Sequence, residues 1–175
     1  MKKSAFTALA LTAIVLVVLP QFLKNYGVYL LTYWLIYIIA TMGLNLTVGY
    51  AGQKSLGQAG LFAAGAYAVA LLTIKTEMNP WLALALSAVV AGVAGVLIAL
   101  PSLRVKGPYL AMVTLAFGVV VEKIVTEWTE VFGGASGLFG IRPITWNGAP
   151  LTMVQWVWLA LGLSLLTHLL LRNLM

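Results

Sequence analysis

The sequence predicts an all-α integral membrane protein with about six transmembrane helices and a glycine-rich broken or re-entrant segment near residues 49–58. Of its 175 residues, 62% are hydrophobic and 8% are charged, whereas soluble domains carry about 25% charged residues. The mean hydropathy is +1.03. Apolar runs long enough to cross a bilayer alternate with segments that collect polar residues, glycine and proline. The expected spans cover residues 4–23, 26–48, 59–74, 81–100, 109–128 and 151–171.

The first two expected spans follow each other closely. Residues 4–23 lie behind Lys2 and Lys3 as in a signal peptide, but no A-x-A-like cleavage site follows. We therefore expect an uncleaved anchor helix within residues 1–25, whose length matches the hydrocarbon core. The first half of the second span is rich in tyrosine and carries Trp34, as in an interfacial aromatic belt.

Residues 43–67 interrupt the apolar pattern. They collect glycines, amides, hydroxyls and Lys54, which a simple spanning helix does not need. Each glycine costs a helix about 0.8–1 kcal/mol relative to alanine, and a lysine at the centre of a lone helix costs at least about 2.5 kcal/mol. A bilayer tolerates such backbone only where it is buried in protein or lines a watery cavity. Two interpretations stay open at this point: a broken helix on a solute path, or a cytoplasmic turn whose glycines serve packing.

The third and fourth expected spans are predicted to pack tightly. The third, residues 59–74, is short and either crosses or re-enters the membrane. The fourth begins at Asn79-Pro80-Trp81, which is typical of an N-cap, a proline at the first helical position and an interfacial tryptophan. Small residues recur at a spacing of four in both spans, which lets helix backbones approach closely. These stripes are Gly60, Ala64 and Ala68 in the third span, and Ser87, Ala91, Gly95 and Ala99 in the fourth.

The rest of the chain supplies two more spans and a long connection. In the fifth span, Thr114, Gly118 and Glu122 fall at a spacing of four and share a face. Glu122 lies near the end of this span, which favours a solvated helix end over a proton relay. Residues 129–150 are rich in glycine and proline, so we expect turns there and no regular structure. The sixth span ends close to Arg172.

Composition excludes several classes of function. The chain has no cysteine and no aspartate, and its one histidine, His168, stands alone. No hydrolytic triad, metal site, cofactor or other catalysis is therefore expected. Residues 49–55 resemble a phosphate-binding loop only loosely, because Gln53 separates Gly52 from Lys54 and no strand precedes them. The 10 lysines and arginines are scattered between apolar runs, which fits loops that face anionic lipid, not nucleic acid, and their distribution favours a cytoplasmic N-terminus.

Three blocks of the sequence resemble the branched-chain amino acid permease family, which supplies membrane subunits of ATP-binding-cassette (ABC) importers. The first block runs from Gly43 to Tyr67, GLNLTVGYAGQKSLGQAGLFAAGAY. The second starts at Leu103, LRVKGPYLAMVTLAF, and the third at Gly133, GGASGLFGIRP. Gln58 departs from the pattern, because a histidine is often found there. The likeness is closer to the LivM-type membrane subunit than to its LivH-type partner.

The resemblance implies that residues 26–175 are the N-terminal part of a permease membrane domain. Family members continue past the sixth span into a cytoplasmic loop that contacts the ATPase and carries a Glu-Ala-Ala-like pattern followed by glycine. No such pattern occurs in this sequence. The resemblance is therefore expected to cover about the first half of such a subunit.

The resemblance further implies translocation of branched-chain amino acids across the bacterial inner membrane by a multi-pass subunit that is not itself an enzyme. The implied partners are a second permease subunit of the same family, ATP-binding subunits and an external solute-binding protein, besides the lipid bilayer. Amides, hydroxyls and glycine backbone would line the solute path. The expected path residues are Asn45, Gly52, Gln53, Ser55, Gly57, Gln58 and Thr114.

Three alternatives remain at this point. The first is an importer of urea or short amides instead of amino acids. The second is a truncated, non-transporting fragment or an assembly partner, because the ATPase contact has no counterpart in the sequence. The third is an independent six-span channel or carrier, whose uptake would persist without ATP.

Overall fold

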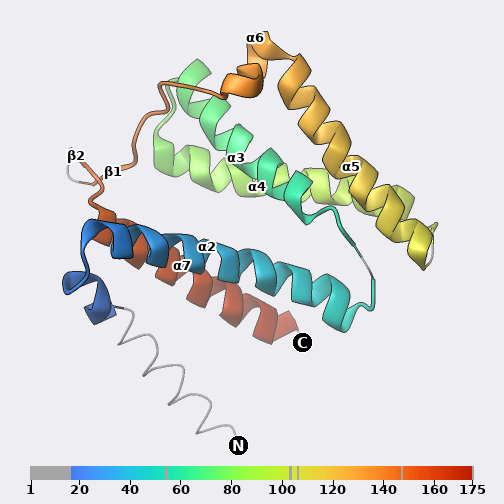
Figure 1. Cartoon of the computed structure of the whole chain (residues 1–175), viewed down its shortest axis with the longest axis horizontal. Coiled ribbons are helices and arrows are strands. Elements are labelled where there is room, and N and C mark those ends of the chain that lie inside the picture. Colours follow the sequence, from blue (N-terminus) through green and yellow to red (C-terminus); the bar gives the residue numbers. More distant parts are fainter. Residues whose placement is uncertain (1–16, 54, 103, 106, 147, 175) are drawn as a thin grey trace, which may run out of the picture. The chain divides into compact units, whose positions relative to one another are not determined.

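The computed structural model describes residues 17–53, 55–102, 104–105, 107–146 and 148–174 (Figure 1). In this part of the chain the long elements are all helices. They are α2 (Asn25–Asn45), α3 (Gln58–Lys75), α4 (Pro80–Ser102), α5 (Pro108–Glu127) and α7 (Met153–Leu174). The short elements are η1 (Leu19–Gln21), η2 (Leu46–Tyr50), α6 (Thr129–Phe132), η3 (Gly134–Ser136), β1 (Thr145–Trp146) and β2 (Ala149–Pro150).

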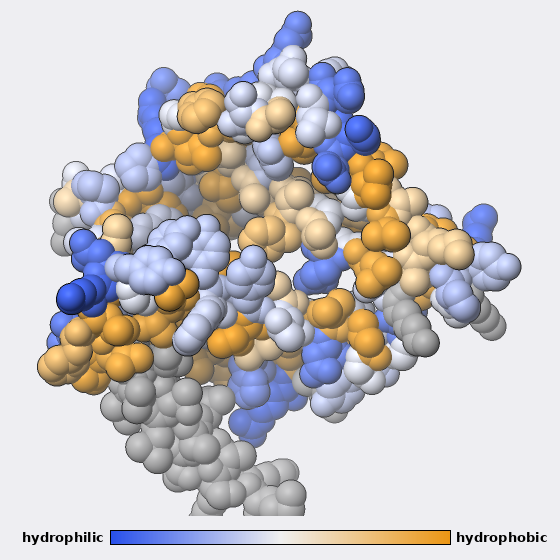
Figure 2. Space-filling view, viewed as in Figure 1, coloured by the Kyte–Doolittle hydropathy of each residue, from blue (hydrophilic) through white to orange (hydrophobic). Residues whose placement is uncertain are grey.

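Five helices in the described residues are long and apolar enough to cross a membrane: α2 continued by η2, α3, α4, α5 and α7. Large apolar side chains such as Val89, Val93 and Leu97 are exposed along α4. Hydrophobic residues cover broad areas of the surface in Figure 2. Such apolar surfaces suit contact with lipid or with other spanning helices. The expected all-α membrane protein is confirmed.

The first expected span, residues 4–23, falls mainly on residues 1–16, which lie outside the described residues. Where its end is described, the chain does not continue as a regular α-helix to residue 23. It forms the 3-10 turn η1, in which Pro20 is buried. Proline has no N–H with which to extend an α-helical ladder, so a tighter turn at this point is physically reasonable.

One compact unit contains η1, α2 and α7. The two long helices run side by side in the same direction (Figure 1). Their shared core is buried and aliphatic, with contributing positions three or four residues apart, as one stripe of each helix requires. It consists of Val28, Leu31, Leu35, Val157, Ala160 and Leu161. The Trp158 indole N–H also donates to the Val17 carbonyl at 3.4 Å.

The second compact unit, residues 44–150, contains α3, α4 and α5. Helix α4 folds back along α3 as an antiparallel hairpin, and α5 returns in the direction of α3 (Figure 1). A Cβ added to Gly65 of α3 would lie 3.7 Å from the Cβ of Ala91 of α4, so small residues do bring these helices close. The stripe of the third span is not directed at α4 alone, because Gly60 packs against α5.

Helix α4 begins with the expected cap. The Asn79 side-chain oxygen accepts the Trp81 backbone N–H at 3.0 Å. Pro80 occupies the first helical position, where an N–H would have no partner within the helix. The helix runs two residues beyond the expected end and includes Pro101 in its last turn.

Residues 129–150 contain short regular elements that the glycine and proline content did not predict. Helix α6 and η3 meet at Gly133, whose φ of 77° lies in the left-handed region that favours glycine. Farther along, β1 and β2 pair antiparallel, with Thr145 opposite Pro150. The expectation of turns alone is therefore wrong for these elements, because glycines with positive φ reverse the chain tightly enough for flanking residues to pair.

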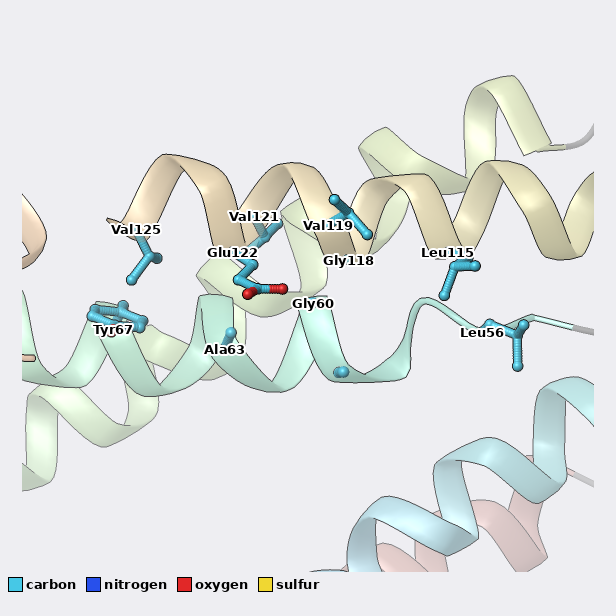
Figure 3. Close-up of a pocket in the computed structure, with 11 residues that line it drawn as sticks. Leu56, Gly60, Ala63, Tyr67, Leu115, Gly118, Val119, Val121, Glu122 and Val125 are labelled. Atoms are coloured by element: carbon cyan, nitrogen blue, oxygen red, sulfur yellow. The ribbon is translucent and has the colours of Figure 1, made fainter. Parts of the chain in front are cut away.

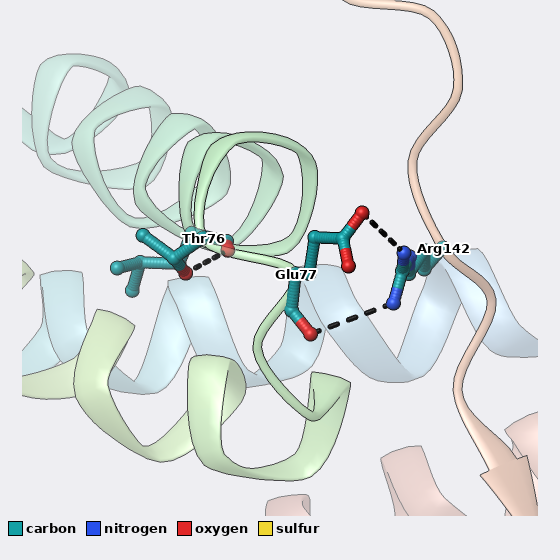
Figure 4. Close-up of polar contacts among 4 residues, drawn as sticks. Thr76, Glu77 and Arg142 are labelled. Atoms are coloured by element: carbon teal, nitrogen blue, oxygen red, sulfur yellow. Dashed lines mark hydrogen bonds and ion pairs between the residues drawn. The ribbon is translucent and has the colours of Figure 1, made fainter.

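Residues 142–146, the anchored segment, are fastened to the turn between α3 and α4. The Arg142 guanidinium forms an ion pair with the Glu77 carboxylate at 3.0 Å (Figure 4). The Trp81 indole N–H donates to the Thr145 carbonyl at 3.0 Å. The rings of Trp81 and Trp146 meet edge to face with centroids 6.0 Å apart. The long connection therefore lies against the start of α4.

Candidate functional site

The break between α2 and α3 has a defined backbone. Helix α2 widens into the π-helix η2, and the chain then leaves helical geometry until Gln58. The N–H groups of Ala51 and Gln53 donate back to Leu46 and Thr47 at 3.0 and 2.9 Å, so these backbone groups are satisfied without a regular helix. The expected broken segment is confirmed as irregular backbone at residues 51–53 and 55–57.

Two glycines shape this break for different reasons. Gly52 has φ of 63°, in the left-handed region, and the space beside it is open. A side chain at Gly49 would collide with the side-chain oxygen of Asn45, one turn earlier. The glycines therefore serve the geometry of the break, whatever passes beside it.

Thr114 joins the end of the break to α5. Its hydroxyl oxygen accepts the Leu56 backbone N–H at 2.9 Å, and the side chain is only 3% exposed. The same hydroxyl donates to the Leu110 or Ala111 carbonyl, at 3.0 and 3.1 Å. A Cβ added to Gly57 would lie 3.2 Å from the Thr114 carbonyl oxygen. The chain near Gly57 is thus seated directly on α5, which residue spacing alone did not indicate.

The expected path residues divide into two groups in the structure. Ser55, Gly57 and Thr114 come together at the contact with α5, and Gly57 and Thr114 are buried. Asn45, Gly52, Gln53 and Gln58 are placed differently. The first three of these are exposed and Gln58 is partly buried. The hydroxyl of Thr114 is occupied by backbone partners, so its direct contribution is to hold the break in place.

A groove of about 420 Å³ lies between α3 and α5 (Figure 3). The two helices approach each other closely at Gly60, which lines the groove. A Cβ added to Gly60 would lie 2.5 Å from Phe117 Cε1 and 3.3 Å from Gly118 Cα. Leu56 lies at one end of the groove and Tyr67 at the other, where the Tyr67 ring packs edge to face on Phe132.

Glu122 lines this groove, which the sequence interpretation missed. Figure 3 shows its carboxylate directed toward α3, near Ala63 and Gly60. The residue is exposed, but it is placed over the groove and not at the tip of the helix. The signal was present in the sequence: Thr114, Gly118 and Glu122 share one face, and that face is the one that α3 meets.

Residues 26–173 match the family described as the permease component of branched-chain amino acid transport systems. The chain belongs to this permease family. It is 39% identical over 135 residues to a protein of Salmonella typhimurium (strain LT2), and 40% identical over 136 residues to one of Escherichia coli (strain K12). Both are named high-affinity branched-chain amino acid transport system permease protein LivM. No solved structure matches the chain.

Each of these alignments covers 77% of this chain and 32% of the relative. The permease-family chain therefore spans about a third of the length of the relatives it matches, less than the expected half. All three sequence blocks lie within the matched residues, and the family resemblance is confirmed.

Proposed function

We propose that the chain is a membrane subunit of an ABC importer that moves branched-chain amino acids, delivered by an external binding protein, across the bacterial inner membrane. The observation that carries this proposal is the family match over residues 26–173. The name shared by the two relatives supports the class of solute. Such a subunit needs helices long enough to span the membrane and a break in one of them. The chain has helices of that length, and its helix break lies within the first of the three sequence blocks.

The break at residues 51–57 is our candidate for the solute path. The amides of Asn45, Gln53 and Gln58 and the Ser55 hydroxyl would replace water around the amino and carboxylate groups of the solute. Gly52 and Gly57 would let the backbone approach it closely. Thr114 would keep the break on α5, through the bond that its hydroxyl accepts from Leu56. Binding along such a path would be weak, so that selectivity would rest mainly with the external protein.

The remaining parts of the proposal concern assembly. Residues 1–25 would anchor the chain in the membrane, residues 26–175 would form part of the permease membrane domain, and the N-terminus would lie in the cytoplasm. A second permease subunit of the same family would complete the path. Separate ATP-binding subunits would drive alternating access, so that this chain would have no catalytic role of its own.

Replacement of Gly57 by leucine tests the proposed path. Because a Cβ at this position already approaches Thr114 to 3.2 Å, the larger side chain must push the break away from α5. We expect Gly57→Leu to insert into the membrane normally and to lose leucine uptake, measured with labelled leucine in cells that make the importer partners. Gly92→Leu is the matched control, since the space beside Gly92 is open.

Each contrary outcome identifies a different function. Normal uptake by a well-inserted Gly57→Leu variant counts against a path at this segment. Competition by urea or short amides, but not by leucine, indicates an amide importer. Uptake that persists without ATP indicates an independent carrier. Failure of the wild-type chain to co-purify with ATP-binding subunits indicates a non-transporting fragment or an assembly partner.

A further inference from the structure

Among the residues that line the α3–α5 groove, Glu122 is the one with a charged side chain. Its carboxylate is directed at a stretch of α3 that offers only small residues, Gly60 and Ala63 (Figure 3). The α5 wall beside it is formed by the aliphatic side chains of Leu115, Val119 and Val125. The groove therefore combines one negative charge with an apolar surface.

The Glu122 carboxylate is exposed and directed into the groove (Figure 3). Glu122 lies about 7.5 Å along the axis from the end of α5 at Glu127, within a helix long and apolar enough to span a membrane. Ionisable side chains in spanning segments are rare, and they pair with an opposite charge or face a water-filled cavity. Within the described residues, no hydrogen bond or ion pair reaches the Glu122 carboxylate.

The size and lining of the groove define what such a partner can be. Its volume of about 420 Å³ falls within the range of sites for small molecules, roughly 300–1,000 Å³. The walls offer apolar contact but little hydrogen bonding, and the one carboxylate favours a single positive charge. A ligand with one ammonium group on a short branched alkyl chain satisfies both requirements.

We propose that this groove binds the ammonium group and the alkyl side chain of an aliphatic amino acid, with the Glu122 carboxylate as the charge partner. This inference rests on the proposed import of branched-chain amino acids and gives that solute a second contact besides the helix break. Leu56 belongs both to the bond with Thr114 and to the lining of the groove, so the two places are continuous along α3 and α5.

Gly118 gives a steric test of the same groove. It lines the groove, and a Cβ built there meets nothing within 4 Å. A valine at this position would place its Cβ in open groove space. The opposite situation holds at Gly60, where an added Cβ collides with Phe117. Gly118→Val therefore separates loss of the site from loss of helix packing.

The direct experiment measures protection of Glu122 in the importer complex reconstituted in lipid nanodiscs. Dicyclohexylcarbodiimide modifies carboxyl groups in apolar surroundings, and mass spectrometry locates the modified residue. Leucine and isoamylamine, which both carry the ammonium group, are expected to slow modification of Glu122. Isocaproate, which keeps the alkyl chain and carboxylate but lacks the amine, is expected to give no protection. Glu130, exposed in α6, is the internal control.

Transport by variants completes the test. Glu122→Gln and Gly118→Val are expected to lose leucine uptake, while Glu130→Gln retains it. In Gly118→Val, leucine is also expected no longer to slow modification of Glu122. If the wild type imports leucine and neither amine slows modification of Glu122, or if Glu122→Gln transports normally, the groove proposal is overturned and the proposed function stands. If the amines protect Glu122 and the wild type imports no branched-chain amino acid, the groove site stands and the proposed function fails.

Discussion

Thr114 uses one hydroxyl for two bonds at the centre of the described site. The oxygen accepts from the Leu56 N–H, and the hydrogen is donated to the preceding turn of α5. A donor left without a partner in such surroundings costs about 1–3 kcal/mol. The side chain is therefore important even if no solute ever contacts it.

Replacement of Thr114 by valine keeps the volume of the side chain and removes the acceptor. We expect Thr114→Val to lower the thermal unfolding temperature of the purified complex and to weaken uptake, because the Leu56 N–H loses its partner. Thr114→Ser retains the hydroxyl and should behave close to wild type. Equal stability of the valine and serine variants would show that water replaces the lost acceptor at no cost.

The ion pair of Glu77 and Arg142 is a weaker contributor. The two side chains are 75% and 51% exposed, so solvent screens their attraction, and exposed pairs are worth only about 0.2–1 kcal/mol. The indole of Trp81 donates one hydrogen bond to the anchored segment and packs against the Trp146 ring. The ion pair alone would therefore hold this segment weakly, and the two tryptophans add further contacts.

At the scale of elements, the packing of α3 against α5 depends on the absence of a side chain at Gly60. The Phe117 ring occupies the space that a Cβ would need, and the Gly118 Cα of α5 lies only 3.3 Å from that position. Gly92 of α4 is the contrasting case, because nothing lies within 4 Å of its Cβ position. Gly60 therefore matters for helix packing within this unit, whereas Gly92 does not.

Substitution by alanine separates these two glycines. Gly60→Ala is expected to lower the thermal unfolding temperature and to loosen α3 from α5. Gly92→Ala is expected to be neutral or stabilising, since alanine is favoured over glycine in helices by about 1 kcal/mol. Circular dichroism or fluorescence melting of the purified complex measures both. A Gly60→Ala variant that melts like wild type would mean that the Phe117 ring can rotate away without cost.

The sequence predicted the long helices but not which of them pack against each other. Apolar runs fixed α3 and α5 within about two residues, and Asn79 marked the start of α4, because these signals are local in the chain. A spacing of four shows which residues share a face but not which helix that face meets, so the contact of Gly60 with α5 had to come from the structure. For the same reason the sequence placed Glu122 near a solvated helix end but could not show that it lines the groove.

The short elements of residues 129–150 were missed for a related reason. They adjoin glycines in left-handed geometry, and Arg142 and Thr145 contact Glu77 and Trp81, which are far away in the sequence. The path residues were only partly brought together. Ser55, Gly57 and Thr114 meet, whereas Gly52 and Gln53 are exposed. Sequence spacing could place the break but not the helix that supports it.

At the scale of the whole molecule, the structure predicts which connections share a side of the membrane. The α3–α4 turn and the anchored segment are joined by direct contacts, so they must lie on one side. Residues 104–105 lie at the other end of α4, which is about 35 Å long. With a cytoplasmic N-terminus, the joined connections would face outward.

Because the chain has no cysteine, single cysteine variants can test this arrangement without background. A membrane-impermeant maleimide applied to spheroplasts is expected to label Thr76→Cys and Phe139→Cys, and to label Arg104→Cys only after the membrane is opened. The reverse pattern for all three would invert the orientation and keep the fold. Labelling of Thr76→Cys and Phe139→Cys from opposite sides would contradict the contacts of the anchored segment.

The attachment of residues 142–146 has a mechanical consequence for any working cycle. The α3–α4 turn can separate from residues 142–146 only if three contacts break. These are an ion pair, an indole hydrogen bond and a ring contact. A tilt of α3 and α4 would therefore also move the exposed rings of Phe139 and Trp146. Any molecule in contact with those two rings would therefore respond to a tilt of α3 and α4.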